Sequence, residues 1–316
     1  MRRRNPTLGL GLVVLGALLF VQNAGASRVA LRAGVDPTAL TTLRVTGTFA
    51  VLLVVAVLFR RDALRPPGGR LGLLLVVHGL VGVAVLQWTY FVAIDRLPVG
   101  MALLLEYQAP LLVALWARFA QREDVRRRLW VGLALAWAGL AAATGIWRGL
   151  VFDGLGVLAG LGAAVCFATY FLVGEHGVGR LDPMRVILWS FGIATVGMNV
   201  VHPLTGTGRA LGDTVGLLGR LDGWHAPVWA VLAWIVVAGT VLPFGVELSA
   251  LRHLPATTVT MVAMLEPIGV SALGWAWFGE SLDAVALVGG VAVVAGIVLA
   301  QSARRAPTLV EPPHLA

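Results

Sequence analysis

The sequence predicts an all-α membrane protein with ten transmembrane helices, arranged as two inverted repeats of five helices with both termini in the cytoplasm. Composition, a series of apolar runs and an internal repeat support this fold class. Of the 316 residues, 58% are hydrophobic and 13% are charged, with a mean hydropathy of +0.87. Soluble domains carry about 45–50% apolar and about 25% charged residues. The composition therefore excludes a water-soluble globule.

The apolar runs have the length that a bilayer requires. A helix needs about 20 mainly apolar residues to cross roughly 30 Å of hydrocarbon. Ten runs of about this length are bounded by charges, prolines or glycines: 7–26, 37–59, 71–94, 97–117, 129–146, 154–173, 184–203, 227–250, 255–278 and 284–301. The connecting segments leave no room for a separate soluble domain, and the longest loop is expected at 205–226.

The first run has an alternative interpretation. Arg2–Arg4, the apolar stretch 8–21 and the small residues 24–26 resemble the three parts of a secretory signal peptide. The repeat described next needs a helix at this place, so an uncleaved first span is the favoured interpretation.

An internal repeat relates the two halves of the chain. Five residues recur at a constant offset of 157: Pro98, Pro110, Glu123, Gly132 and Gly139 match Pro255, Pro267, Glu280, Gly289 and Gly296. The expected units are residues 1–150 and 151–316. Because each unit has five spans, an odd number, the second enters the membrane from the opposite side. Such inverted repeats are typical of secondary transporters, whose binding site lies near the midplane between the repeats.

Arginine placement predicts the orientation. With both termini in the cytoplasm, the cytoplasmic segments hold nearly three times as many arginines as the opposite segments, as the positive-inside rule requires. The net charge of +8 is therefore attributed to orientation in the lipid bilayer. We expect no nucleic-acid partner.

Glu106 is the leading candidate site residue. Ionisable groups within membrane helices are costly and indicate function by default. Glu106 lies about halfway along the fourth run, next to Tyr107 and Gln108, and Pro110 deprives the Glu106 carbonyl of its helical hydrogen-bond donor. The cluster could bind an ammonium group or exchange a proton, although a structural glutamate at a proline kink remains an alternative.

Other polar residues within the runs are weaker candidates. Glu266 precedes Pro267 in the second half, and Glu247 follows Pro243 near the predicted cytoplasmic end, where a charge at headgroup level is an equal alternative. Polar or aromatic side chains that could line a site, or otherwise hold helices together, are Asn23, Gln87, Trp88, Tyr90 and Tyr170.

Several polar residues receive structural interpretations instead. Arg44 is expected to extend its charge outward to the membrane surface, and His78 to bond a neighbouring helix. Glu123 and Glu280 are expected at membrane edges rather than at the site. Cys166, the single cysteine, lies in an apolar run and is expected to be a buried structural thiol.

Three segments carry a family resemblance. Ala102–Pro110, Val241–Glu247 and Met264–Pro267, together with the duplicated ten-span plan, resemble the EamA type of the drug/metabolite transporter superfamily, and within it the threonine/homoserine exporter branch. The resemblance implies an exporter of the inner membrane that works by alternating access, often driven by protons. It also supports Glu106, Glu247 and Glu266 as cavity residues.

The expected function is export of a small polar metabolite, such as threonine or homoserine, with protons as coupling ions. A broad drug or dye exporter is the alternative within transport, and a non-transporting membrane adaptor is the alternative of another class. The sequence contains no nucleotide-binding motif, metalloprotease motif or serine-hydrolase motif, so neither an enzyme nor a cofactor or metal is expected. A homodimer is left open.

Overall fold

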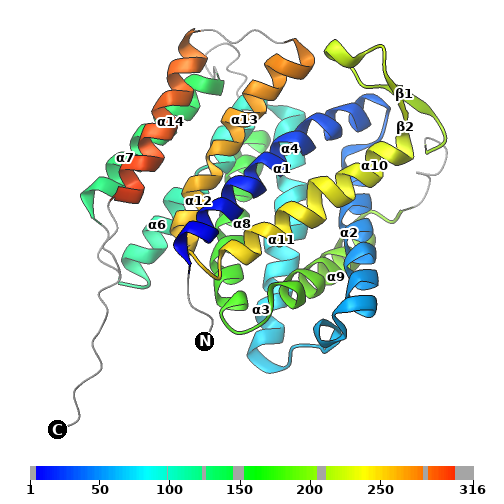
Figure 1. Cartoon of the computed structure of the whole chain (residues 1–316), viewed down its shortest axis with the longest axis horizontal. Helices are drawn as coiled ribbons and strands as arrows, with labels where there is room; N and C mark the ends of the chain where they lie inside the picture. Colours follow the sequence, from blue (N-terminus) through cyan, green and yellow to red (C-terminus); the bar gives the residue numbers. More distant parts are fainter. Residues whose placement is uncertain are drawn as a thin grey trace.

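The computed structural model describes residues 5–97, 99–122, 126–144, 153–204, 211–279 and 284–302. Figure 1 shows the helices gathered into one bundle. The helices up to residue 144 are α1 (Pro6–Arg32), α2 (Pro37–Phe59), α3 (Gly69–Gly79), α4 (Leu86–Arg96), α5 (Val99–Glu106), α6 (Ala109–Phe119) and α7 (Arg127–Thr144). The later ones are α8 (Gly154–Val178), α9 (Pro183–Val201), α10 (Val228–Val236), α11 (Leu242–Ala250), α12 (Ala256–Ala263), α13 (Leu265–Leu273) and α14 (Ala284–Ser302).

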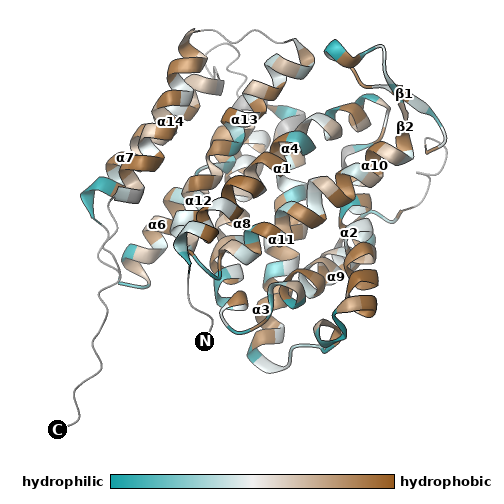
Figure 2. Ribbon diagram, viewed as in Figure 1, coloured by the Kyte–Doolittle hydropathy of each residue, from teal (hydrophilic) through white to brown (hydrophobic). Residues whose placement is uncertain are grey.

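Several of these helices join end to end into membrane-spanning lengths. Within the described residues, eight helical stretches are long and apolar enough to cross a membrane, and α14 adds a shorter apolar helix. Figure 2 shows hydrophobic residues along the helices, with hydrophilic residues more frequent in the connections. The chain is thus a multi-pass helical membrane protein, as the hydropathy pattern predicts.

Helix irregularities recur at the offset of the sequence repeat. A π-helical segment, η2 (Leu80–Val85), joins α3 to α4, and another, η6 (Val237–Val241), joins α10 to α11. The two begin 157 residues apart. A turn at residues 107–108 separates α5 from α6, and Met264 separates α12 from α13. The structure therefore extends the repeat from single residues to the shape of the helices.

Corresponding helices of the two halves pack in opposite directions. A Cβ atom placed on Gly132 would meet the Gly296 carbonyl at 2.6 Å, and one on Gly139 would meet the Gly289 carbonyl at 2.6 Å. Later residues of α7 thus face earlier residues of α14, so these two helices are antiparallel. Figure 1 shows this pair at one edge of the bundle.

The same relation holds between α2 and α9. The Asn199 side-chain amide donates to Thr46 Oγ1 at 3.0 Å, and Thr42 Oγ1 donates to the His202 carbonyl at 3.1 Å. Higher residue numbers on α9 thus face lower residue numbers on α2, so these two helices are antiparallel as well.

The first helix of each half packs against the third span of the other half. α1 contacts α10, η6 and α11, while α8 contacts α3, η2 and α4. Glycines within the π segments permit both contacts: a Cβ atom on Gly239 would overlap the Asn23 side chain, and one on Gly82 would meet Tyr170 Cα at 3.0 Å.

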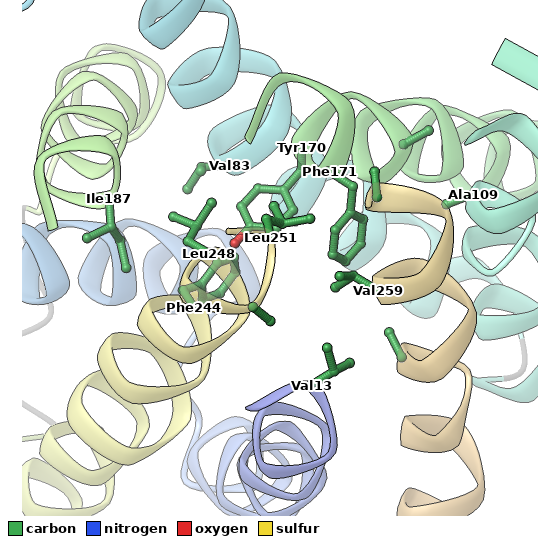
Figure 3. Close-up of a cluster of buried hydrophobic side chains, with 14 of the residues drawn as sticks. Val13, Val83, Ala109, Tyr170, Phe171, Ile187, Phe244, Leu248, Leu251 and Val259 are labelled. Carbon is green, nitrogen blue, oxygen red and sulfur yellow. The ribbon is translucent and has the colours of Figure 1, made fainter. Parts of the chain in front are cut away.

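The largest apolar cluster joins both halves. Figure 3 shows Tyr170 and Phe171 of α8 against Phe244 and Leu248 of α11. The Tyr170 and Phe244 rings meet edge to face, with centroids 5.4 Å apart. Val13, Val83 and Ala109 of the first half belong to the same buried cluster, so the cluster joins the two halves.

Two parts of the chain differ from the sequence expectation. α1 continues past residue 26 to Arg32 and stops at Gly34, which has a φ of +85°, because the arginines after residue 26 do not themselves break a helix. In the predicted loop 205–226, the described part forms an antiparallel pair, β1 (Thr214–Gly216) with β2 (His225–Pro227). The Trp277 indole donates to the Leu217 carbonyl at 2.9 Å and ties this hairpin to η7 (Gly274–Phe278).

Outside the membrane spans, acidic residues cap the starts of three helices, α2, α8 and α9. Asp153 accepts a hydrogen bond from the Gly156 amide at 2.7 Å, and this bond lowers the pKa of the Asp153 carboxyl. Asp182 similarly accepts from the Met184 amide at 3.0 Å and pairs with Arg252 at 3.1 Å. These capping bonds fix where α8 and α9 begin.

Candidate functional site

A cavity of about 570 Å³ lies between the two halves. Its walls come from α1, α2, α4, α5 and the α5–α6 turn in the first half, and from α8, α11, α13 and η7 in the second. Most of these elements belong to membrane-spanning stretches. The cavity is therefore an internal space of the bundle, of the size in which small molecules bind.

Six charged side chains line this cavity, and four of them come close to one another. Glu106 ends α5, Glu247 lies in α11, Glu266 lies in the first turn of α13, and Arg44 comes from α2. Glu266 is close enough to interact electrostatically with each of the other three. Charged groups at such a depth are costly unless they are paired or face a polar cavity, so their convergence makes this cavity the candidate functional site.

The interrupted helices place two of these carboxyl groups. Pro110 and Pro267 lack an amide hydrogen and stand near the starts of α6 and α13, so they leave the carbonyls four residues earlier without the usual donor. Tyr107, in the α5–α6 turn, donates its hydroxyl to Glu266 Oε2 at 2.8 Å. This bond joins the two interruptions, one from each half.

Uncharged polar groups surround the carboxylates. Asn23, Ser27 and Gln87 line the cavity and are at least nine-tenths buried, yet each has a side-chain polar atom without a hydrogen-bond partner in the described structure. The Glu247 Oε2 atom likewise has no hydrogen-bond partner in the described structure. Buried polar atoms are normally satisfied, so the cavity offers unused hydrogen bonds to a ligand.

Aromatic rings complete the wall. Tyr90 lines the cavity beside five phenylalanines, Phe20, Phe91, Phe167, Phe244 and Phe278. Phe20 and Phe244 meet edge to face with centroids 5.1 Å apart. The rings provide apolar contact area around the charged groups.

At one end the lining of the cavity packs against the core cluster, and at the other end it reaches the last turns of two helices. Phe20, Phe167 and Phe244 belong to the main core cluster or pack against it. At the opposite end the lining includes Arg28, Arg32 and Phe278, near the ends of α1 and η7, and the Arg28 guanidinium lies 4.3 Å from the Phe278 ring centroid. We take this end as the mouth.

A second, smaller cavity lies at the other end of the bundle. It has a volume of about 260 Å³ and is lined by the last turns of α6 and α8 and the first turn of α12, including Gln121, Glu175 and Thr257. Val113 and Ala256 line it and also belong to the core cluster. The core cluster thus separates the two cavities.

Most of the predicted site residues line the main cavity: Asn23, Gln87, Tyr90, Glu106, Tyr107, Glu247, Glu266 and Pro267. Two predicted residues lie elsewhere. Gln108 bonds the Leu104 carbonyl of the preceding turn at 3.3 Å, and Tyr170 is fully buried beside His78 and Phe171. Pro110 and Pro243 act through the helix shape and are buried near the starts of α6 and α11.

Two structural interpretations are corrected, and one weak site candidate is ruled out. Arg44 does not extend outward: its side chain is buried and lines the cavity, because its face of α2 points into the bundle. Glu247 is 1% exposed and is covered by α1 at Gly16, so it is not a headgroup-level charge. Trp88 is 45% exposed on the outside of the bundle and lines no site.

Of the remaining expectations, two are confirmed and two concern residues that the structure does not describe. His78 Nδ1 bonds Ser190 Oγ at 2.7 Å across α3 and α9, and Cys166 is a buried free thiol, as predicted. Glu123 and Glu280 lie outside the described residues. Within the described part of the chain, no cluster of three or more histidine, cysteine or acidic side chains could hold a metal ion.

Ser27 and the phenylalanine wall were missed by the sequence reasoning. Ser27 lies beyond residue 26, where the first span was expected to end, and the phenylalanines cannot be distinguished from lipid-facing residues by composition. For Ser27 the missed signal was the absence of a helix breaker before Gly34.

The bundle and its charged internal cavity define the class of a multi-pass membrane transporter. The EamA-like transporter family model matches twice, over residues 7–145 and 154–301, and the chain belongs to this family. It is a protein of the cytoplasmic membrane.

Curated relatives agree with this membership. An uncharacterized transporter of Archaeoglobus fulgidus is 26% identical over 302 residues, covering 95% of this chain and 97% of its own. The threonine/homoserine exporter RhtA of Salmonella typhimurium is 29% identical over 286 residues, covering 90% and 88%. A solved crystal structure, 19% identical, shares the fold with a TM-score of 0.76 over 93% of this chain and 96% of that chain.

Proposed function

We propose that this protein is a secondary carrier that exports a small zwitterionic metabolite, an amino acid such as threonine or homoserine. The observation that carries the proposal is the meeting of Glu106, Glu247, Glu266 and Arg44 in one internal cavity. A zwitterion needs both signs of charge in its site, and the cavity provides both. The similarity to threonine/homoserine exporters supports the same substrate class.

The proposed architecture is ten spans in two inverted repeats, 1–150 and 151–316, with both termini in the cytoplasm. The antiparallel packing of α7 with α14 and of α2 with α9 supports inversion. The exchange of α1 and α8 between the halves supports a pseudo-two-fold axis. The arginine bias supports the orientation, which turns the mouth of the main cavity toward the outer face.

Alternating access is the proposed mechanism. The main cavity and the smaller cavity lie at opposite ends of the core cluster. Rocking of the two halves around the carboxyl groups would close one cavity while the other opens. In this scheme the described conformation faces outward, the state in which an exporter releases its substrate.

Proton coupling completes the proposal. Glu106, Glu247 and Glu266 can bind and release protons, and carboxyl groups within transport paths act as proton relays. Since three carboxylates share one cavity, binding an ammonium group and binding a proton compete for the same negative charges. Competition between substrate and proton for one site is what a substrate/proton antiporter requires.

A drug or dye exporter is the second candidate, and the phenylalanine wall favours it. Purified protein in proteoliposomes separates the two: we expect labelled threonine to exchange across the membrane and an excess of unlabelled homoserine to compete. Transport of a lipophilic cationic dye without threonine exchange would favour the second candidate. No exchange of either would leave the adaptor hypothesis, and a homodimer stays a prediction.

A further inference from the structure

Arg44 has no acidic partner at ion-pair distance in the part of the chain that the structure describes. It lies in α2, is 7% exposed and lines the main cavity. Its Nε atom donates to Thr240 Oγ1 at 3.3 Å. Among the described residues, no carboxylate oxygen lies within 4.0 Å of the guanidinium, and its terminal nitrogens have no hydrogen-bond partner.

Keeping such an arginine side chain buried costs free energy. Arginine remains charged in proteins and offers five N–H donors in a planar fork, and a buried charge costs several kcal/mol unless it is compensated. Glu266 interacts with Arg44 through space, but its Oε2 atom already accepts the Tyr107 hydroxyl. The protein's own groups therefore leave most of the guanidinium donors unused.

Other polar atoms of the cavity are also unused. Gln87 lines the same cavity and is 6% exposed, and both its side-chain amide atoms lack a partner in the described structure. A carboxylate oxygen could accept from the Gln87 amide nitrogen as well as from Arg44. Tyr90, one helical turn further along α4, also lines the cavity.

We propose that Arg44 binds the carboxylate of the substrate, while Glu266 and Glu106 hold its ammonium group. The cavity would then select molecules that carry both groups, and would discriminate against amines whose carboxylate is absent or masked. The inference rests on the proposed function and specifies which part of the substrate is recognised. A simpler role, in which Arg44 only balances the acidic charge, predicts no such selection.

Arginine suits this task better than lysine because its fork matches a carboxylate with two parallel hydrogen bonds. The charge-balancing role needs only a positive charge, which lysine also supplies. Substitution of Arg44 by lysine therefore separates the two roles.

The experiment measures binding of threonine and threonine amide to purified protein in lipid nanodiscs. The amide keeps the ammonium group and the side chain but replaces the carboxylate with a neutral group. We expect the wild type to bind threonine at least about tenfold more tightly than the amide, since charge-assisted bidentate bonds are lost. Arg44→Lys should lose most of this preference, and Arg44→Gln all of it.

Arg61→Gln is the matched control, because Arg61 is exposed and bonds the Val57 carbonyl outside the cavity. It should keep the wild-type preference. Thermal melting of each variant identifies any that fails to fold, in which case the other Arg44 variant decides.

Equal binding of threonine and its amide by the wild type would overturn the carboxylate assignment while leaving amino-acid transport intact. A preference that survives in Arg44→Lys would overturn it as well. If the wild type binds neither compound but binds a cationic dye, the proposed function fails, and the assignment of Arg44 fails with it.

Discussion

Substitution of Gly239 tests how closely α1 must approach the π segment η6. In Gly239→Ala, the new Cβ atom would overlap the Asn23 Oδ1 atom and lie 2.6 Å from Asn23 Cγ and 2.9 Å from Asn23 Cβ. Ordinary Cβ contacts begin at about 3.4 Å, so Cγ must withdraw by about 0.8 Å. Rotation of the Asn23 amide relieves only the overlap with Oδ1, because the Asn23 Cβ atom is bonded to the α1 backbone and cannot rotate away.

The cost has two parts. Overpacking of this kind typically destabilises a protein by about 1–3 kcal/mol, which should lower the thermal midpoint of the purified protein. Displacement of Asn23 would remove one hydrogen bond to the substrate, worth about 0.5–1.5 kcal/mol, so threonine should bind roughly 2- to 12-fold more weakly.

Gly245→Ala is the matched control for this prediction. Gly245 lies in α11 of the same span, and a Cβ atom there meets nothing within 4 Å. Melting curves and threonine binding should stay at wild-type values in this variant. If Gly239→Ala behaves like Gly245→Ala in both assays, the contact between α1 and η6 is not as tight as the structure describes.

Three further predictions address charge, helix packing and the core. Glu106→Gln should abolish or uncouple proton-driven flux in proteoliposomes without affecting membrane insertion, since it removes only the titratable proton; normal gradient-dependent flux would make Glu106 structural. Gly139→Ala should lower the melting midpoint, by roughly 1–3 kcal/mol of stability, because its Cβ atom would lie 2.6 Å from the Gly289 carbonyl oxygen; an unchanged midpoint would contradict the close α7–α14 contact. Ser190→Ala should destabilise the fold by about 1–3 kcal/mol, because it removes the bond to buried His78, and threonine binding measured alongside should not change.

The fold class was predictable because a bilayer constrains sequences strongly. Apolar runs of about 20 residues follow from the thickness of hydrocarbon, and prolines at 110 and 267 mark where the helices are interrupted. The repeat was visible because the same prolines and glycines recur at one offset. The π segments were not predicted, since no residue type specifies an extra residue in a helical turn.

The site was only partly predictable, because a helix presents residues in all directions and a single sequence does not say which direction faces the cavity. Glu106 and Glu266 were found because a carboxyl within an apolar run is rare. Arg44 was misassigned for this reason: two turns from a helix end, its side chain could reach either the membrane surface or the interior. In the structure α2 packs against η6 and Arg44 bonds Thr240, so the Arg44 side chain is directed to the interior.

Substrate protection of a single cysteine tests the central claim most directly, namely that the cavity between the two halves holds the substrate. Val270 lines this cavity, so Val270→Cys would be introduced after the one native cysteine, Cys166, is changed to alanine. We expect a membrane-impermeant thiol reagent added at the outer face to label the new cysteine, and threonine to slow that labelling. Labelling at an unchanged rate in saturating threonine, in a variant that still transports it, would contradict the account.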